Sequence, residues 1–394
     1  MRKSFYLMVV AALTWTGCSQ NEIMDTNPDA HRAIGFGVYT GTQTRGVVTD
    51  NSTTNGGTAN GLKVADKGFG MQAYLTSGAY QTNGLKGHFM DNVHVTWNAS
   101  GSAWTYSPVK FWPENTTDKV SFFAYAPYTD TSNTTATGIS FLPASNASDP
   151  VLGFKLQTAQ QNMVDLVVSE SNSGNNGTID QTQTTTAGSS VNINFKHVLT
   201  RVAMKAKTST DISASDNLTK VIITGVSIEH TEKLSNSALL NMKTLEWTSN
   251  QFLANSYALE KYSDNAKKGI MNYASFAFGN ARHSDAIDIS TSSTGVSLFP
   301  DNQYLFLIPV NNASGTTNKG DVSVKISYMI ITKASDDNDS VSTSENTKTV
   351  ELPAGIFKRG SAYELIFTIS LNAIKLDVTD VESWTSTPTD VTVQ

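Results

Sequence analysis

The chain has 394 residues, which is long enough for two domains of ordinary size, each with its own hydrophobic core. Charged residues make up 16% of it, and the formal net charge is −6. An acidic chain without basic clusters argues against nucleic acid as a partner and gives no electrostatic reason to bind an anionic membrane surface.

The first residues are typical of an export signal. Two basic residues precede the apolar run 5–13, which is too short to span a bilayer as a permanent helix. We therefore interpret residues 1–17 as a signal peptide. Cys18 is the only cysteine, so no disulfide can form within the chain. Residues 16–18 resemble the lipobox of bacterial lipoproteins, apart from Trp15 where an aliphatic residue is usual, and this implies acylation of Cys18, palmitate included. The alternative is an ordinary secreted protein with one free thiol.

The first strand predicted after the signal carries Ile34, Phe36 and Val38 at alternate positions, with glycines between them. This spacing places the three side chains on one face. The strand runs directly into the polar tract 42–60, which contains Arg45. A strand meant to stay in a core is rarely joined by so exposed a tether, so we hypothesise that this strand is removable.

Alternating apolar runs recur along the rest of the chain, and no stretch shows a sustained helical period. The runs are 69–75, 94–97, 104–112, 120–126, 191–195, 201–206, 221–228, 304–310, 322–328 and 362–369. Clusters of Asn, Gly, Ser, Thr and Asp separate them, which is typical of antiparallel β-sandwiches. A weak pattern around 256–262 could form a short helix. The sequence therefore predicts an all-β fold.

The clearest break in composition is the tract 171–190, which is almost free of apolar residues. We expect it to contribute nothing to a core. Long loops without secondary structure are uncommon inside a domain, so the tract favours a junction over a loop within one domain. The predicted units are a propeptide of residues 18–45, an N-terminal β-sandwich of residues 46–188 and a C-terminal β-sandwich of residues 189–394.

Signals of catalysis or metal binding are weak. The six histidines show no ligand spacing such as HExxH, and there is no Gly-x-Ser-x-Gly motif, phosphate-binding loop or Cys-x-x-Cys. His197, near a strand end, is interpreted as a hydrogen-bonded structural histidine. The acidic run 334–340 resembles a calcium loop but lacks its central glycine and distal glutamate, so we interpret it as a solvated turn. We predict no enzyme activity, no catalytic residue, no metal site and no cofactor.

An aromatic cluster lies between residues 104 and 128. Its members are Trp104, Tyr106, Phe111, Trp112, Phe122, Phe123, Tyr125 and Tyr128. Such rings could form a platform for stacking sugars. However, Trp104 and Tyr106 share one strand face, as do Phe123 and Tyr125, and such pairs are used in sandwich cores. We expect a core role. A surface lipoprotein that binds glycans through these rings and never polymerises stays the alternative.

Several short motifs follow one another in order after the signal. They are Cys18 in its lipobox, Thr44-Arg45-Gly46 after the first strand, the runs 104–113 and 120–127, the run 194–202 and the late run 352–363. In this order and spacing they resemble the fimbrillin family, the type V pilins of Gram-negative anaerobes. The resemblance covers nearly everything after the signal. It implies two transthyretin-like antiparallel β-sandwich domains in tandem, export as a lipoprotein, cleavage after an arginine and polymerisation by strand exchange.

The resemblance places the cleavage between Arg45 and Gly46. Loss of residues 18–45 would remove the lipidated Cys18 together with the first strand and leave an open apolar groove. A strand of another subunit could fill that groove, and a head-to-tail contact that does not close on itself builds a filament. A cut at Arg32, before the strand, would release the lipid without opening the groove.

The natural source of the incoming strand is the C-terminus, where the candidate donor residues are Trp384, Val391 and Val393. Pro388 interrupts the pattern, although proline is tolerated at a strand edge. A tail that can donate favours a stalk subunit, while a tip or accessory subunit stays possible. A secreted hydrolase with an unrecognised site is the least favoured alternative.

The partners that follow are other pilin subunits in a homo- or hetero-polymer and an arginine-specific surface protease. The precursor would have a lipid anchor in the outer membrane, and the mature subunit would lie in an extracellular fimbrium. A host or bacterial surface receptor would complete an adhesive role.

Overall fold

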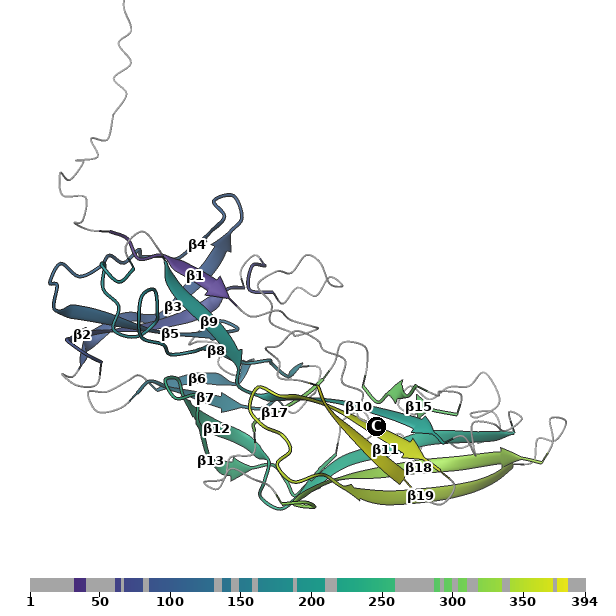
Figure 1. Cartoon of the computed structure of the whole chain (residues 1–394). Helices are drawn as coiled ribbons and strands as arrows, with labels where there is room; N and C mark the ends of the chain where they lie inside the picture. Colours follow the sequence, from purple (N-terminus) through teal and green to yellow (C-terminus); the bar gives the residue numbers. More distant parts are fainter. Residues whose placement is uncertain are drawn as a thin grey trace, which may run out of the picture.

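A computed structural model describes residues 32–39, 61–64, 67–80, 85–130, 137–142, 149–157, 162–186, 190–209, 218–258, 287–290, 294–299, 304–309, 318–334, 341–370 and 374–381. The secondary-structure elements in these residues are all β-strands (Figure 1), which confirms the predicted all-β fold. The finer prediction of two transthyretin-like sandwiches stays a prediction.

The first sheet has seven strands and curls back toward its own edge. In spatial order they are β1 (Phe36–Tyr39), β9 (Val191–His197), β8 (Val167–Ser169), β5 (Asp118–Ala126), β2 (Phe69–Ser77), β3 (Leu85–Asn98) and β4 (Ala103–Thr105). β1 pairs with β9 in parallel, and the other neighbours are antiparallel. Ala33, which precedes β1, forms an antiparallel bridge with Phe111, which lies in the segment between β4 and β5. The segment at β1 therefore closes the gap between the two ends of the sheet.

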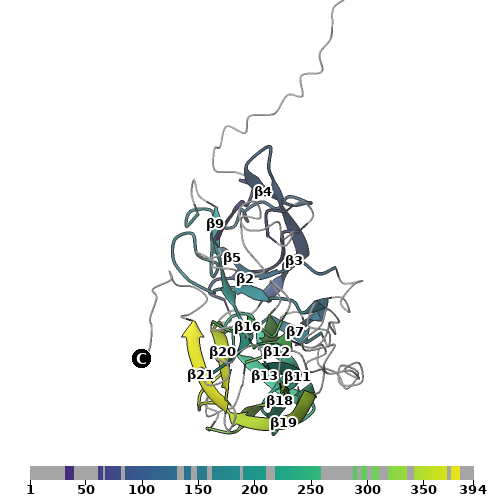
Figure 2. The same cartoon turned by 90° about the vertical axis from the view of Figure 1, so that its right-hand side faces the viewer.

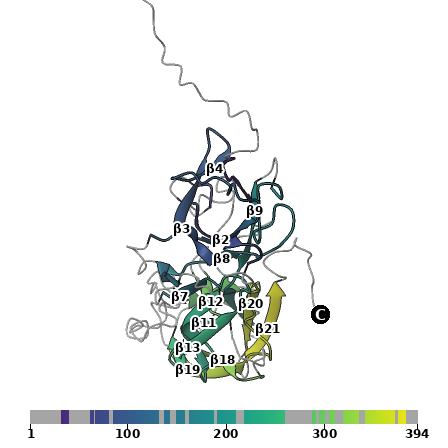
Figure 3. The ribbon, with the colours of Figure 1, turned by 90° about the vertical axis from the view of Figure 1, so that its left-hand side faces the viewer.

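Three further sheets lie below the first one in Figures 2 and 3. A four-stranded sheet contains β13 (Trp247–Phe252), β12 (Ser235–Asn241), β7 (Val151–Lys155) and β6 (Ile139–Leu142). A second contains β16 (Val296–Ser297), β10 (Thr200–Thr208), β20 (Ala362–Ile369) and β21 (Ile374–Val381), with β17 (Leu305–Leu307) beside β10. A third contains β14 (Ser256–Ala258), β11 (Thr219–His230), β18 (Val322–Lys333) and β19 (Val341–Glu351), with β15 (Ile287–Asp288) beside β11.

Strand β5 supplies side chains to two hydrophobic clusters because successive residues of a strand point to opposite faces. Phe122 packs inside the curled first sheet, together with Trp104 and Trp112. Phe123 and Tyr125 pack on the other face, in the cluster that also contains residues of β6, β7 and β12. All five rings are buried, which confirms the predicted core role for these members of the aromatic cluster. The prediction was wrong for Phe111, whose side chain is 47% exposed.

The pairing of the strands crosses the predicted boundary between residues 188 and 189. β9 follows that boundary but belongs to the first sheet, while β6 and β7 precede it and pair with each other and with β12. β9 leads almost directly into β10, so this stretch connects the first sheet to the sheet that contains β10, β20 and β21. The division into residues 46–188 and 189–394 stays a prediction.

The polar tract 171–190 differs from expectation. Thr178, Gln181 and Thr186 are buried, and backbone N–H groups of β5 donate to the carbonyls of Thr178 (2.7 Å) and Gln181 (2.9 Å). The prediction that this tract contributes nothing to a core was wrong, because Ile179 packs in the hydrophobic cluster that contains Phe123 and Tyr125. The expected helix near residue 256 was also wrong at its start, since residues 256–258 form β14.

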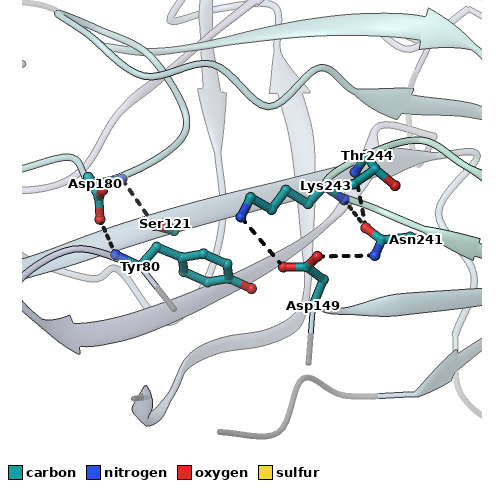
Figure 4. A network of polar contacts seen from close by, with 7 residues as sticks. All are labelled: Tyr80, Ser121, Asp149, Asp180, Asn241, Lys243 and Thr244. Atoms are coloured by element: carbon teal, nitrogen blue, oxygen red, sulfur yellow. Dashed lines mark hydrogen bonds and ion pairs between the residues drawn. The ribbon is translucent and has the colours of Figure 1, made fainter. Parts of the chain in front are cut away.

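A polar network connects the first sheet to the four-stranded sheet (Figure 4). On one side, the Tyr80 N–H donates to Asp180 Oδ1 at 2.7 Å. On the other, Asn241 Nδ2 donates to Asp149 Oδ2 at 3.1 Å, and the Lys243 ammonium lies 5.1 Å from the centre of the Tyr80 ring. Burial raises the pKa of Tyr80, and the nearby Asp149 carboxylate adds to the rise. The contact between the Lys243 ammonium and the Tyr80 ring therefore joins the two halves of this network.

Candidate functional site: the slot of strand β1

The apolar face of the first strand is buried inside the curled sheet. Ile34 and Phe36 are only 2% and 6% exposed. The Phe36 ring centre lies 5.4 Å from that of Tyr106, 5.8 Å from Phe122 and 6.3 Å from Phe69. Val38 is half-buried and packs against the same cluster. The structure thus brings together the three residues that the alternation predicted.

Both sides of this segment are hydrogen-bonded to the sheet. On the β9 side, Phe36 pairs with Val191 and the Val191 N–H donates to the Gly35 carbonyl at 3.0 Å. On the other side, the Ile34 N–H donates to the Lys110 carbonyl at 2.9 Å. We call the space between β9 and residues 110–112, which residues 32–39 fill, the slot.

Tyr106 connects the slot to the loop beside it. Its hydroxyl donates to the Ile34 carbonyl at 2.8 Å and accepts from the Lys110 N–H at 3.3 Å. Burial raises the pKa of Tyr106, and the backbone contact with Lys110 opposes part of that rise. The hydroxyl is therefore protonated at neutral pH and able to donate to the strand.

The outer face of the segment carries no side chain at Gly35 and Gly37. Side chains around the start of β9 lie close to both positions. A Cβ atom at Gly35 would lie 3.1 Å from Ser190 Oγ, and one at Gly37 would lie 3.0 Å from Asn192 Oδ1. Both neighbours are ends of side chains that can rotate. The atoms closest to the two glycines thus belong to side chains, and the close backbone approach expected from the sequence stays a prediction.

Sequence reasoning found the strand but missed the residues that hold its outer edge. Nothing in the sequence pointed to residues 110–112 as a pairing edge, or to the Tyr106 hydroxyl as a donor. The expected lipidation site Cys18, the cleavage site Arg45–Gly46 and the donor candidates Trp384, Val391 and Val393 lie outside the described residues.

The described part of the chain holds few groups suited to chemistry. Among its residues there is no group of three or more His, Cys, Asp and Glu side chains that could hold a metal ion. His197 Nδ1 lies 3.0 Å from Asp165 Oδ1, and both side chains are buried, which confirms the structural role predicted for His197. No helix that the structure describes is both long and apolar enough to span a bilayer.

Comparison with known proteins agrees with this geometry. The profile of the Fimbrillin-like family matches residues 44–384. The chain belongs to the fimbrillin-like family. It is similar to the fimbrium subunit Fim1C of Phocaeicola vulgatus, with 36% identity over 399 aligned positions that cover 98% of each protein.

A solved structure of a fimbrial protein is also similar over most of the chain. The crystal structure of a fimbrial protein from Bacteroides vulgatus shares 31% identity and gives a TM-score of 0.69, covering 90% of this chain and 99% of that one. The resemblance drawn from the sequence motifs is thereby confirmed. The family is one of fimbrial structural proteins and not of enzymes.

Proposed function

We propose that this chain is a structural subunit of a cell-surface fimbria, polymerised by donor-strand exchange after cleavage at Arg45. The observation that carries the proposal is the slot, in which the short segment 32–39 lies between two edges of one sheet. Its apolar face is buried and its backbone is paired on both sides. A segment with these contacts and a polar tether works as a removable placeholder.

Removal of the segment would leave the sheet open in two ways. The cavity lined by Phe69, Tyr106 and Phe122 would lose the Phe36 ring that fills it. At about 1.5–3 kcal/mol per fully buried large apolar side chain, the loss of Ile34 and Phe36 costs several kcal/mol. The backbone groups of β9 and of residues 110–112 would lose their partners as well, which favours pairing with a new strand.

The structure also supports Arg45 over Arg32 as the cleavage site. The Arg32 carbonyl accepts a hydrogen bond from the Trp112 N–H at 3.0 Å, so the backbone there is already paired. A protease needs an unpaired, exposed stretch of chain, and polar tracts such as the one around Arg45 are preferred sites of cutting. A cut at Arg45 also removes the whole slot segment.

The rest of the proposal concerns the anchor, the partners and the location of the subunit. The precursor is a lipoprotein anchored in the outer membrane through Cys18, and its partners are other pilin subunits and an arginine-specific surface protease. The mature subunit lies in an extracellular fimbrium that supports adhesion, with two transthyretin-like sandwiches as its body. We favour a stalk position over a tip because a C-terminal tail is available to donate.

The glycan-binding alternative loses its main support. Trp104 and Trp112, the two rings on which it rests, are buried in the core of the first sheet. A buried ring has no open face on which a sugar could stack. No other described residue favours a second function.

The test is an Arg45→Ala precursor with Arg32→Ala as its matched control. We expect the Arg45→Ala protein to stay lipidated, uncut and unpolymerised on cells, as judged by mass spectrometry of its N-terminus and electron microscopy of the surface. The Arg32→Ala protein should be cut and should form filaments like the unmodified chain. Normal filaments built from Arg45→Ala subunits would end the proposal.

A further inference from the structure

Two exposed apolar side chains lie beside the slot. Among the residues that the structure describes, three large apolar side chains are exposed: Val109 (51%), Phe111 (47%) and Leu239 (43%). Leu239 belongs to β12 in the four-stranded sheet, whereas Val109 and Phe111 lie together between β4 and β5. Two of the three thus share one place at the edge of the slot.

The surroundings of these two residues are apolar and free of negative charge. Pro108 is exposed as well, and we call Pro108, Val109 and Phe111 the rim patch. The run 103–113 contains no aspartate or glutamate, although the chain as a whole has a net charge of −6, and Lys110 is its one charged residue. The rim patch therefore presents apolar side chains and one cation to a partner.

The rim patch lies where the chain that comes from Cys18 enters the first sheet. The Trp112 N–H, next to Phe111, donates to the Arg32 carbonyl at 3.0 Å. Residues 19–31, thirteen in all, separate Arg32 from Cys18. A chain of this length spans at most about 50 Å when fully extended. Figures 2 and 3 show the first sheet at one end of the molecule and β19 at the other, so a lipid on Cys18 keeps the end with the rim patch close to the bilayer.

We propose that the rim patch contacts the lipid surface in the uncut precursor, with Val109 and Phe111 inserted at the boundary between headgroups and acyl chains. This inference rests on the proposed function, because it needs the lipid anchor at Cys18. It gives the precursor a second membrane contact, which is made by the folded part of the chain.

A lipid surface fits the rim patch in chemistry and in strength. Apolar and aromatic side chains insert at the membrane interface, and a lysine beside them can extend its ammonium to the lipid phosphates. Two side chains bury too little to hold a protein on a bilayer by themselves, since even one whole acyl chain binds only marginally. The short tether raises the local concentration of the bilayer at the patch, so a weak contact is sufficient.

Cleavage ends this contact without changing the rim patch. A cut between Arg45 and Gly46 removes Cys18 together with the tether, whereas Val109 and Phe111 stay with the mature subunit. The mature subunit then has the same patch without the high local concentration. It therefore leaves the lipid surface once it is cut.

A fluorescent probe beside the rim patch tests the contact in the full lipidated precursor, kept uncut by Arg45→Ala. A lipidated Cys18 has no free thiol and the chain has no other cysteine, so Ser107→Cys provides a single labelling site at an exposed position. The precursor is reconstituted in phosphatidylcholine vesicles, with and without lipids that carry a quenching spin label near the headgroup. We expect quenching of the probe at residue 107 and none at the matched control Leu239→Cys, an exposed position on another sheet.

The decisive variant removes the rim patch and keeps the probe. With Val109→Ser and Phe111→Ser added, the quenching at residue 107 should be lost while circular dichroism shows the same fold. Quenching that persists in this variant means that the tether alone brings this end to the bilayer, and it overturns the inference. If the same substitutions, with Arg45 restored, abolish filaments instead, the patch binds a second copy of the chain and not lipid.

The mass of the purified precursor tests the proposed function separately. A lipidated Cys18 without quenching at residue 107 overturns this inference and leaves the proposed anchor in place. An unmodified Cys18 contradicts the proposed anchor, and this inference fails with it.

Discussion

At the scale of single residues, Phe36 in the slot and Phe111 at its edge are in opposite situations. Phe36 is 6% exposed and is surrounded by three aromatic rings, whereas Phe111 is 47% exposed on the outer side of the same sheet. Replacing each of them with alanine therefore distinguishes the loss of a buried ring from the loss of an exposed one.

We predict that Phe36→Ala lowers the free energy of unfolding of the uncut chain by about 3–5 kcal/mol, as removal of a buried ring usually does. Phe111→Ala should change it by no more than about 0.5 kcal/mol, as surface substitutions do. Denaturant unfolding followed by fluorescence measures both. Equal effects of the two substitutions would show that the Phe36 ring is not held in the core.

The raised pKa of Tyr106 predicts a dependence of stability on pH. Because the folded pKa lies above the unfolded one, the unfolded chain loses its proton first as the pH rises. The contribution of Tyr106 is then complete below about pH 10 and is lost as the pH rises through the folded pKa. Unfolding measured from pH 8 upward should show this loss, and Tyr106→Phe should reduce the slope; an unchanged slope in the variant would contradict the assignment.

The sequence could predict part of this site and not the rest. The alternation of Ile34, Phe36 and Val38 is a local pattern, so it is sufficient to indicate which side chains share a face. The hydrogen bond from Tyr106 to Ile34 joins residues 72 positions apart, and no local pattern encodes it. The pairing of Ala33 with Phe111 depends likewise on the curl of the whole sheet.

At the scale of elements, β1 is a short strand whose sheet partner is distant in the sequence. It has four residues, and its partner β9 lies more than 150 residues along the chain. The alternation predicted both strands, but their parallel pairing and the place of β9 in the first sheet could not be inferred, because composition marked the boundary at 188 instead.

We predict that a chain beginning at Gly46 is less stable than the uncut chain by several kcal/mol, since it lacks two buried apolar side chains of the slot. A synthetic peptide of residues 32–39 should restore stability in proportion to its concentration, as any ligand of the folded state does. The matched control is the same peptide with Ile34 and Phe36 replaced by serine. Equal rescue by the control peptide would contradict the slot.

At the scale of the whole molecule, one subunit must both offer an open slot and donate a strand if it belongs in a stalk. The slot and the proposed donor tail are different parts of the chain, so a contact between them is head-to-tail and does not close. The slot is described by the structure, and the donor is proposed from the tail that follows β21.

We predict that deletion of residues 384–394 leaves folding and cleavage unchanged but abolishes polymerisation of the deleted chain alone. Mixed with cleaved full-length chain, the deleted protein should still accept a tail and so cap the ends of growing polymers. Size-exclusion chromatography with light scattering would show the shorter polymers. Polymers of unchanged length from the deleted chain would assign the donor strand to another segment and favour a tip or accessory position.

The most direct measurement for the account is the N-terminal residue of the subunits in fimbriae isolated from cells. A placeholder that is clipped out before assembly predicts subunits that begin at Gly46, with no peptide from residues 18–45. Fimbriae whose subunits begin upstream of Ile34 would show that the slot segment stays in place, and the account would fail.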